Sequence, residues 1–131
     1  MAPNTLKDRY LSNTVETVSP ARLVTMLYDA LVRDLSLAEA AITTLRHEDA
    51  NSRLVHAQAI VFELRASLKL DAWSGAAGLA QLYTFLLSEL LDANVRKDAA
   101  VVASCRKLVE PLQSAWHEAA GRITEGKVAI A

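Results

Sequence analysis

The sequence predicts an all-α protein, an antiparallel up-down-up-down four-helix bundle preceded by a short mobile N-terminal segment. Composition is the first observation: 52% of the 131 residues are hydrophobic and only 5% aromatic, with 4 Gly and 3 Pro, which favours packed helices over sheet. Periodicity is the second. Apolar residues recur three and four positions apart in four segments joined by short polar connections, and helices joined by short loops pack as antiparallel neighbours.

The first helix is predicted to extend from Pro20 to Leu45. Ser19 can accept a hydrogen bond from an amide of the first turn, and Pro20 stands where its missing N–H is not needed. The second helix is predicted to be capped by Asp49 and to end near Lys69. Its apolar residues alternate three and four apart, the seam expected of near-antiparallel helices.

The third helix is predicted to extend from Gly75 to Ala93, with Asn94 as the first residue beyond its end. The fourth is predicted to be capped by Asp98 and to end near Ala120, just before a glycine. The three connections are short enough that consecutive helices must be antiparallel neighbours.

Three parts of the chain are therefore expected. Residues 1–18 hold a few apolar side chains, including Tyr10 and Val15, among polar ones. They are too few to fold alone and are predicted to dock on the bundle, which comprises residues 19–121. Residues 122–131 are predicted to be a frayed tail.

Charge and cysteine content exclude several classes of protein. The formal net charge is −1, so the chain has no excess of basic residues for nucleic acid and no electrostatic reason to bind a membrane. The N-terminus lacks the apolar core of a signal peptide, and no run is long enough for membrane insertion. The single cysteine, Cys105, fits a reducing cytosol and is predicted to be a core residue.

Catalytic and metal-binding patterns are missing. None of His47, His56 and His117 follows a glutamate by three positions, as inward-facing Glu-x-x-His ligands of a metal bundle would. The sequence also has no phosphate-binding glycine loop, nucleophile elbow or Cys-x-x-Cys. We therefore expect no enzyme activity, no metal and no cofactor.

The predicted helices carry more apolar residues than a bundle stripe needs. Those beyond the stripes are Phe85, Leu87 and Leu91 on the third helix, Val55 and Phe62 on the second, and Val24, Leu31, Leu35 and Ile42 on the first. On the fourth helix, the apolar residues from Val101 to Trp116, Leu108 included, lie on one face and are assigned to the core. Tyr28 is predicted to lie off the core line of the first helix and to cover its junction with residues 1–18.

Two explanations of this excess stay open. Folded proteins expose many apolar side chains without a purpose. Alternatively, the excess forms a groove for the apolar face of a partner, or for residues 1–18 when no partner is bound. A homodimer interface would produce the same pattern on a helical wheel.

A set of motifs in a fixed order resembles one protein family. The motifs are Tyr10, Val15-x-Thr17-x-Ser19-Pro20, Met26-Leu27-Tyr28-Asp29, Leu82-Tyr83 and Ala93-Asn94, followed by Trp116. Together they resemble the FliS family, the export chaperones of bacterial flagellin, over nearly the whole chain. Two departures are Val18, where the family usually has a small residue, and Trp73-Ser74-Gly75, where it tends to have a glycine-rich turn.

The resemblance implies a cytosolic chaperone that binds the disordered C-terminal segment of flagellin along its outer grooves. Binding would prevent premature polymerisation and deliver flagellin to the flagellar type III export gate. The candidate partner-binding residues are Tyr10, Val15, Leu27, Tyr28, Val55, Phe62, Leu82, Tyr83, Leu86, Leu87, Leu91 and Asn94. The alternative is a self-associating helical bundle whose apolar faces form a homodimer interface.

Overall fold

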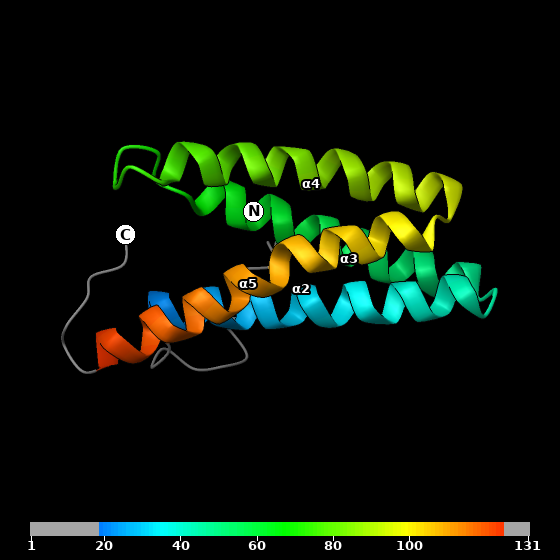
Figure 1. The fold of residues 1–131 in the computed structure, drawn as a ribbon, viewed down its shortest axis with the longest axis horizontal. Coiled ribbons are helices and arrows are strands. Elements are labelled where there is room, and N and C mark those ends of the chain that lie inside the picture. Colours follow the sequence, from blue (N-terminus) through cyan, green and yellow to red (C-terminus); the bar gives the residue numbers. More distant parts are fainter. Residues whose placement is uncertain (1–18, 125–131) are drawn as a thin grey trace, which may run out of the picture.

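A computed structural model describes residues 19–124, which form four α-helices and no strand. The helices are α2 (Pro20–Thr43), α3 (His47–Ser67), α4 (Ala76–Arg96) and α5 (Ala99–Thr124). They run alternately in opposite directions along the long axis (Figure 1). The predicted all-α, up-down-up-down four-helix bundle is confirmed. Residues 1–18, predicted as a docking segment, and most of the predicted tail lie outside the described part of the chain.

Each helix packs against two others and none packs across the diagonal. α2 has the largest interfaces, with α5 and with α3, whereas the contact between α4 and α5 is the smallest of the four. Figure 1 shows the reason: α5 begins beside the end of α4 and then diverges from it, crossing toward the start of α2. Pro111 lies inside α5, and an interior proline bends a helix because it cannot donate the backbone hydrogen bond.

The core is broader on α2 than the sequence indicated. Leu31 and Leu35 are fully buried and Ile42 is nearly so, although the helical wheel placed them beside the core stripe. That prediction was wrong because α2 is enclosed by two large interfaces, and such a helix buries a wider apolar arc. Cys105 is buried as predicted, and burial raises the pKa of its thiol to about 11.

The predicted starts of the first and last helices are confirmed by their caps. The Arg22 amide donates to Ser19 Oγ over 3.1 Å, and the Ala100 and Val101 amides donate to Asp98 Oδ1 over 3.0 and 3.3 Å. Each side chain satisfies amides that have no partner within the helix.

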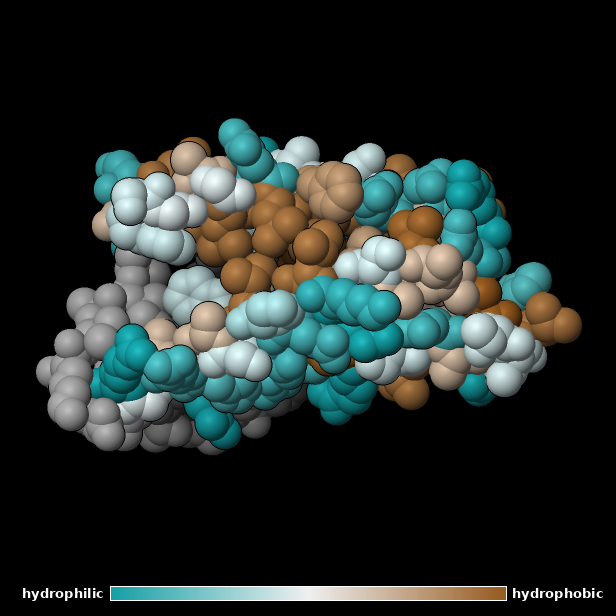
Figure 2. All heavy atoms as spheres, viewed as in Figure 1, coloured by the Kyte–Doolittle hydropathy of each residue, from teal (hydrophilic) through white to brown (hydrophobic). Residues whose placement is uncertain are grey.

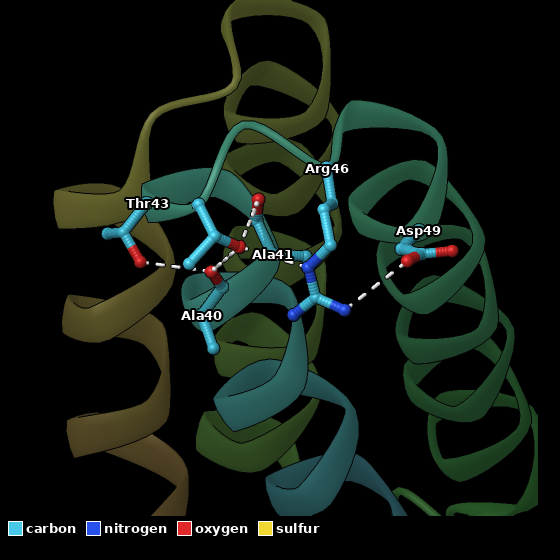
Figure 3. A network of polar contacts seen from close by, with 6 residues as sticks. Ala40, Ala41, Thr43, Arg46 and Asp49 are labelled. Atoms are coloured by element: carbon cyan, nitrogen blue, oxygen red, sulfur yellow. Dashed lines mark hydrogen bonds and ion pairs between the residues drawn. The ribbon is translucent and has the colours of Figure 1, made fainter.

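Two other helix starts differ from prediction. Helix α3 begins at His47, without a side-chain cap, so Asp49 lies in its first turn. There the Asp49 carboxylate accepts from the Arg46 guanidinium at 3.4 Å, in the network that Figure 3 draws. Helix α4 begins at Ala76, one residue after the predicted Gly75.

The helix ends also differ. Helix α2 ends at Thr43 and α3 at Ser67, so both end two residues earlier than predicted. Helices α4 and α5 instead run past Asn94 and Ala120 to Arg96 and Thr124. Asn94 is therefore an interior helical residue, and the αL residue that follows α4 is Lys97, with φ 52°.

The turn between α2 and α3 holds a leucine in a left-handed conformation. Leu45 has φ 59°. The Arg46 amide donates to the Ala41 carbonyl over 2.7 Å and the Leu45 amide to the Ile42 carbonyl over 3.1 Å, the paired bonds that end a helix at an αL residue. The Thr44 hydroxyl adds a bond to the Ala40 carbonyl over 2.8 Å, so the turn is fixed from several sides (Figure 3).

Replacing Leu45 by glycine is expected to raise the free energy of unfolding by about 0.5–1 kcal/mol, because only glycine adopts φ > 0 without a steric cost. The leucine side chain is 78% exposed, so little packing is lost. Urea unfolding of the two proteins measures the difference. Leu45→Ala serves as the control: it removes the same exposed side chain but keeps the Cβ, so it should not stabilise.

Candidate functional site

One flank of α4 faces α5 and is apolar. Burial, and secondly the negative charge of Glu89 on α4, raises the pKa of the Cys105 thiol on α5. We therefore use Glu89 and Cys105 as reference positions for the flanks by which the two helices approach each other. Residues three, four, seven or eleven positions apart share a helical face. By that spacing, Leu82 and Phe85 share the Glu89 face of α4. The residues that share the Cys105 face of α5 are Leu108, Leu112 and Trp116.

These five residues, Leu82, Phe85, Leu108, Leu112 and Trp116, are named here the α4/α5 strip. Phe85 and Leu108 are exposed, by 49% and 44%, while the other three are half-buried against the core. Figure 2 shows a continuous hydrophobic area between the α4 and α5 rows of atoms. It lies where Figure 1 shows the two helices diverging, so the uncovered apolar surface follows from the bundle geometry.

The opposite flank of α4 faces α3 and carries a second apolar set. Asn94 donates to the side-chain oxygen of Asn51 on α3 over 2.9 Å, which identifies the facing sides. Leu87 and Leu91 share the Asn94 face, while Val55 and Phe62 share the Asn51 face. We name Val55, Phe62, Leu87 and Leu91 the α3/α4 strip. All but Leu87, which is half-buried, are exposed, Phe62 by 60%.

The residues proposed from the sequence divide into three groups. The members of the α3/α4 strip lie at the surface, and Leu82 lies in the α4/α5 strip. Leu27, Tyr28, Tyr83 and Leu86 are instead core residues, each at most 2% exposed, and Asn94 is buried between α3 and α4. Tyr10 and Val15 lie outside the described residues. The expected position of Tyr28 off the core line was wrong, because α2 buries that side against α5.

Three α5 residues of the α4/α5 strip, Leu108, Leu112 and Trp116, are predicted from the sequence to be core residues on one face of α5. Leu108 is exposed instead, whereas Leu112 and Trp116 are half-buried against the core. Phe85 is predicted to be surplus to the core but is not among the predicted site residues. An apolar face on α5 looks like core as long as α4 is assumed to cover it. Pro111, an interior proline of α5, is the sequence feature that could indicate a change in the direction of this helix.

Polar contacts hold α2 firmly to both of its neighbours. The buried Asp34 carboxylate accepts from the Arg53 guanidinium over 3.3 Å and pairs with Nδ1 of His56, both on α3. On the other side, the Arg106 guanidinium of α5 donates to Glu39 over 3.1 Å. These contacts join α2, α3 and α5 but not α4.

Helix α4 has only two side-chain hydrogen bonds to other helices among the described residues. One joins Asn94 to Asn51, and the other joins the hydroxyls of Tyr28 on α2 and Tyr83 at 2.6 Å, in the core. Neither bond goes to α5, so no side-chain hydrogen bond among the described residues joins α4 to α5. Burial raises the pKa of both phenols, and both hydroxyls therefore stay protonated.

Asp29 contributes a pH-dependent contact between α2 and α5. Partial burial alone would raise the pKa of its carboxyl, but hydrogen bonds from His117 and Gln113, at 2.7 and 2.9 Å, outweigh it, so the pKa lies below its usual value. A depressed folded-state pKa stabilises the fold above the unfolded pKa, and this stabilisation disappears as pH falls through the folded pKa. Asp29→Asn should therefore be less stable than the parent above about pH 4. The difference should shrink toward lower pH in urea unfolding, and a constant difference would contradict this.

No group of three histidine, cysteine or acidic residues within 19–124 is arranged to hold a metal. None of the four helices described is long and apolar enough to cross a membrane.

Comparison with known proteins identifies the family of this chain. The family model described as flagellar protein FliS matches residues 2–123. The chain belongs to the FliS family. A relative named flagellar secretion chaperone FliS, from Bacillus subtilis (strain 168), is 30% identical over 110 residues, which are 84% of this chain and 82% of the relative. FliS proteins are chaperones and not enzymes.

Two further FliS relatives carry the same name. The one from Vibrio cholerae serotype O1 is 26% identical over 109 residues, 82% of this chain and 80% of the relative. The one from Salmonella typhimurium (strain LT2) is 28% identical over 115 residues, 82% of each chain. The family model, which matches residues 2–123, includes α2 to α4, all but the last residue of α5, and both apolar strips.

Proposed function

We propose that this FliS-family protein is a flagellin-specific export chaperone, active in the cytosol. Its client is the C-terminal segment of flagellin, which it keeps from polymerising before delivery to the flagellar type III export apparatus. The observation that carries the proposal is the pair of apolar strips on the two flanks of α4, in a chain of a flagellar secretion chaperone family.

The chemistry of the strips suits a client that is disordered when free. An amphipathic segment can lay an apolar face along a strip between two helices, with anchors three and four positions apart. Such a segment gives up conformational entropy on binding, so the chaperone needs an extended apolar surface. Two strips on one helix provide that surface, and the ordered bundle has little entropy of its own to lose.

The strips also suit the alternative, a homodimer in which each copy covers the other. Nothing about a single strip distinguishes the two occupants, because both would bury Phe85 or Phe62. The family membership favours the chaperone. If the protein both self-associates and binds a client, the two processes would compete for the same apolar strips.

The decisive experiment is size-exclusion chromatography with light scattering on the purified protein, alone and with the C-terminal segment of flagellin from the same organism. We expect a monomer alone and a one-to-one complex with the segment. A stable dimer that ignores the flagellin segment would overturn the proposal and support the homodimer.

A further inference from the structure

The buried hydrogen bond between Tyr28 and Tyr83 has a role that neither the family match nor the apolar strips account for. The two residues stand on α2 and α4, which are diagonal in the bundle and do not pack directly. Their side chains therefore meet end to end through the core, with the hydroxyls 2.6 Å apart. A polar pair in an apolar core costs desolvation, and such pairs can specify one arrangement of the elements they join.

The Tyr28–Tyr83 bond is one of only two side-chain hydrogen bonds that join α4 to another helix among the described residues. The second, from Asn94 to Asn51, ties α4 to α3 near the end where α4 turns into α5. Toward the opposite end, where α4 and α5 diverge (Figure 1), Tyr83 supplies the side-chain hydrogen bond that holds α4. Elsewhere along its length α4 could shift without breaking a side-chain hydrogen bond to another helix.

The tyrosine pair is also connected to the α4/α5 strip. The Tyr28 ring lies against the Trp116 indole, with ring centroids 6.2 Å apart and the ring planes tilted by 37°. Tyr28 thus contacts Trp116, which belongs to the α5 side of the strip. Tyr83 lies on α4 next to Leu82, which belongs to the α4 side of the strip.

We infer that the Tyr28–Tyr83 hydrogen bond positions α4, holding it at a fixed distance from α2 and so setting the width of the α4/α5 strip that receives the client. The inference rests on the proposed function for the client, but the positioning of α4 can be measured without one. Both tyrosines are positioning residues, since they are buried and touch the client only through the strip.

The test compares the double variant Tyr28→Phe/Tyr83→Phe with the parent protein. Removing both hydroxyls leaves no unpaired partner within the tyrosine pair, and such paired replacements can be nearly neutral for stability. We expect the free energy of unfolding to stay near the parent value. We also expect the flagellin segment to bind about fivefold more weakly, the affinity equivalent of one hydrogen bond.

Thr25→Val is the matched control. Its hydroxyl is buried like those of the tyrosines, but it donates to the Arg22 carbonyl within α2 over 2.7 Å and joins no second helix. It should change neither binding nor α4. The single variant Tyr83→Phe, which leaves the Tyr28 hydroxyl without this partner, should be less stable than the double variant if the bond exists in solution.

Amide hydrogen exchange of the unliganded proteins provides the second readout. In the double variant, amides of α4 on the Ala76 side of Tyr83 should exchange about fivefold faster, while α2 and α5 keep their protection. Unchanged α4 exchange, or unchanged affinity in a parent protein that does bind, overturns the inference. If the parent binds no flagellin segment, the proposed function fails, and α4 exchange alone decides whether the tyrosines position this helix.

Discussion

Leu35→Ala is expected to lower the free energy of unfolding by about 3 kcal/mol, the usual result of emptying a fully buried leucine site. Leu35 is 0% exposed on α2, the helix with the two largest interfaces. Neighbouring helices held by ion pairs on both sides of α2 cannot collapse fully into the space that the substitution opens. Urea unfolding followed by circular dichroism measures the loss.

The matched control is Leu37→Ala, which makes the same chemical change two positions further along α2. Leu37 is 40% exposed, so we expect its truncation to cost no more than about 0.5–1 kcal/mol. Equal losses for the two variants would mean that Leu35 and Leu37 are equally buried in solution. The core described for α2 would then be wrong.

Local features of this fold could be predicted from the sequence. The Ser19 and Asp98 caps depend on a side chain and the amides two or three residues away, and both are confirmed. The count and direction of the helices follow from periodicity and short loops. The C-terminal ends of α2 and α4 were harder to predict from the sequence. Each is followed by a residue in the αL conformation, Leu45 or Lys97, at a position where glycine is the usual sequence signal.

Burial could not be predicted where it depends on how many neighbours a helix has. A helical wheel gives the direction of a side chain but not the size of the facing interface. Leu35 appeared surplus and is core, since α2 is enclosed by two large interfaces. Leu108 appeared to be core and is exposed, since α5 diverges from α4.

The candidate site was predicted in part for the same reason. All four residues of the α3/α4 strip, Val55, Phe62, Leu87 and Leu91, were among the partner-binding residues predicted from the sequence. They could be recognised because they lie outside the apolar stripe that each helix needs for packing in the bundle. The α5 wall of the other strip was missed. It becomes visible only when the angle between α4 and α5 is known, and that angle is a property of the whole bundle.

Phe85→Asp is expected to weaken binding of the flagellin segment about a hundredfold, in the range found for central aromatic anchors. Phe85 is the large aromatic side chain on the α4 wall of the α4/α5 strip, and half of its surface is uncovered. The substitution removes apolar area from the interface and would place a carboxylate beneath the client without a partner. Because the side chain lies outside the core, the helical circular dichroism signal should persist. Isothermal titration with the flagellin segment measures the affinity.

Two further aspartates identify which surface the client covers. Phe62→Asp alters the α3/α4 strip and should also weaken binding if the client extends over both flanks of α4. Leu37→Asp adds the same charge at an exposed leucine of α2, which does not pack against α4, and should leave the affinity unchanged. Loss of binding in the Leu37 variant would indicate general charge repulsion. Parent-like affinity in both phenylalanine variants would show that neither strip holds the client, because an apolar segment cannot cover a buried, unpaired carboxylate without losing affinity.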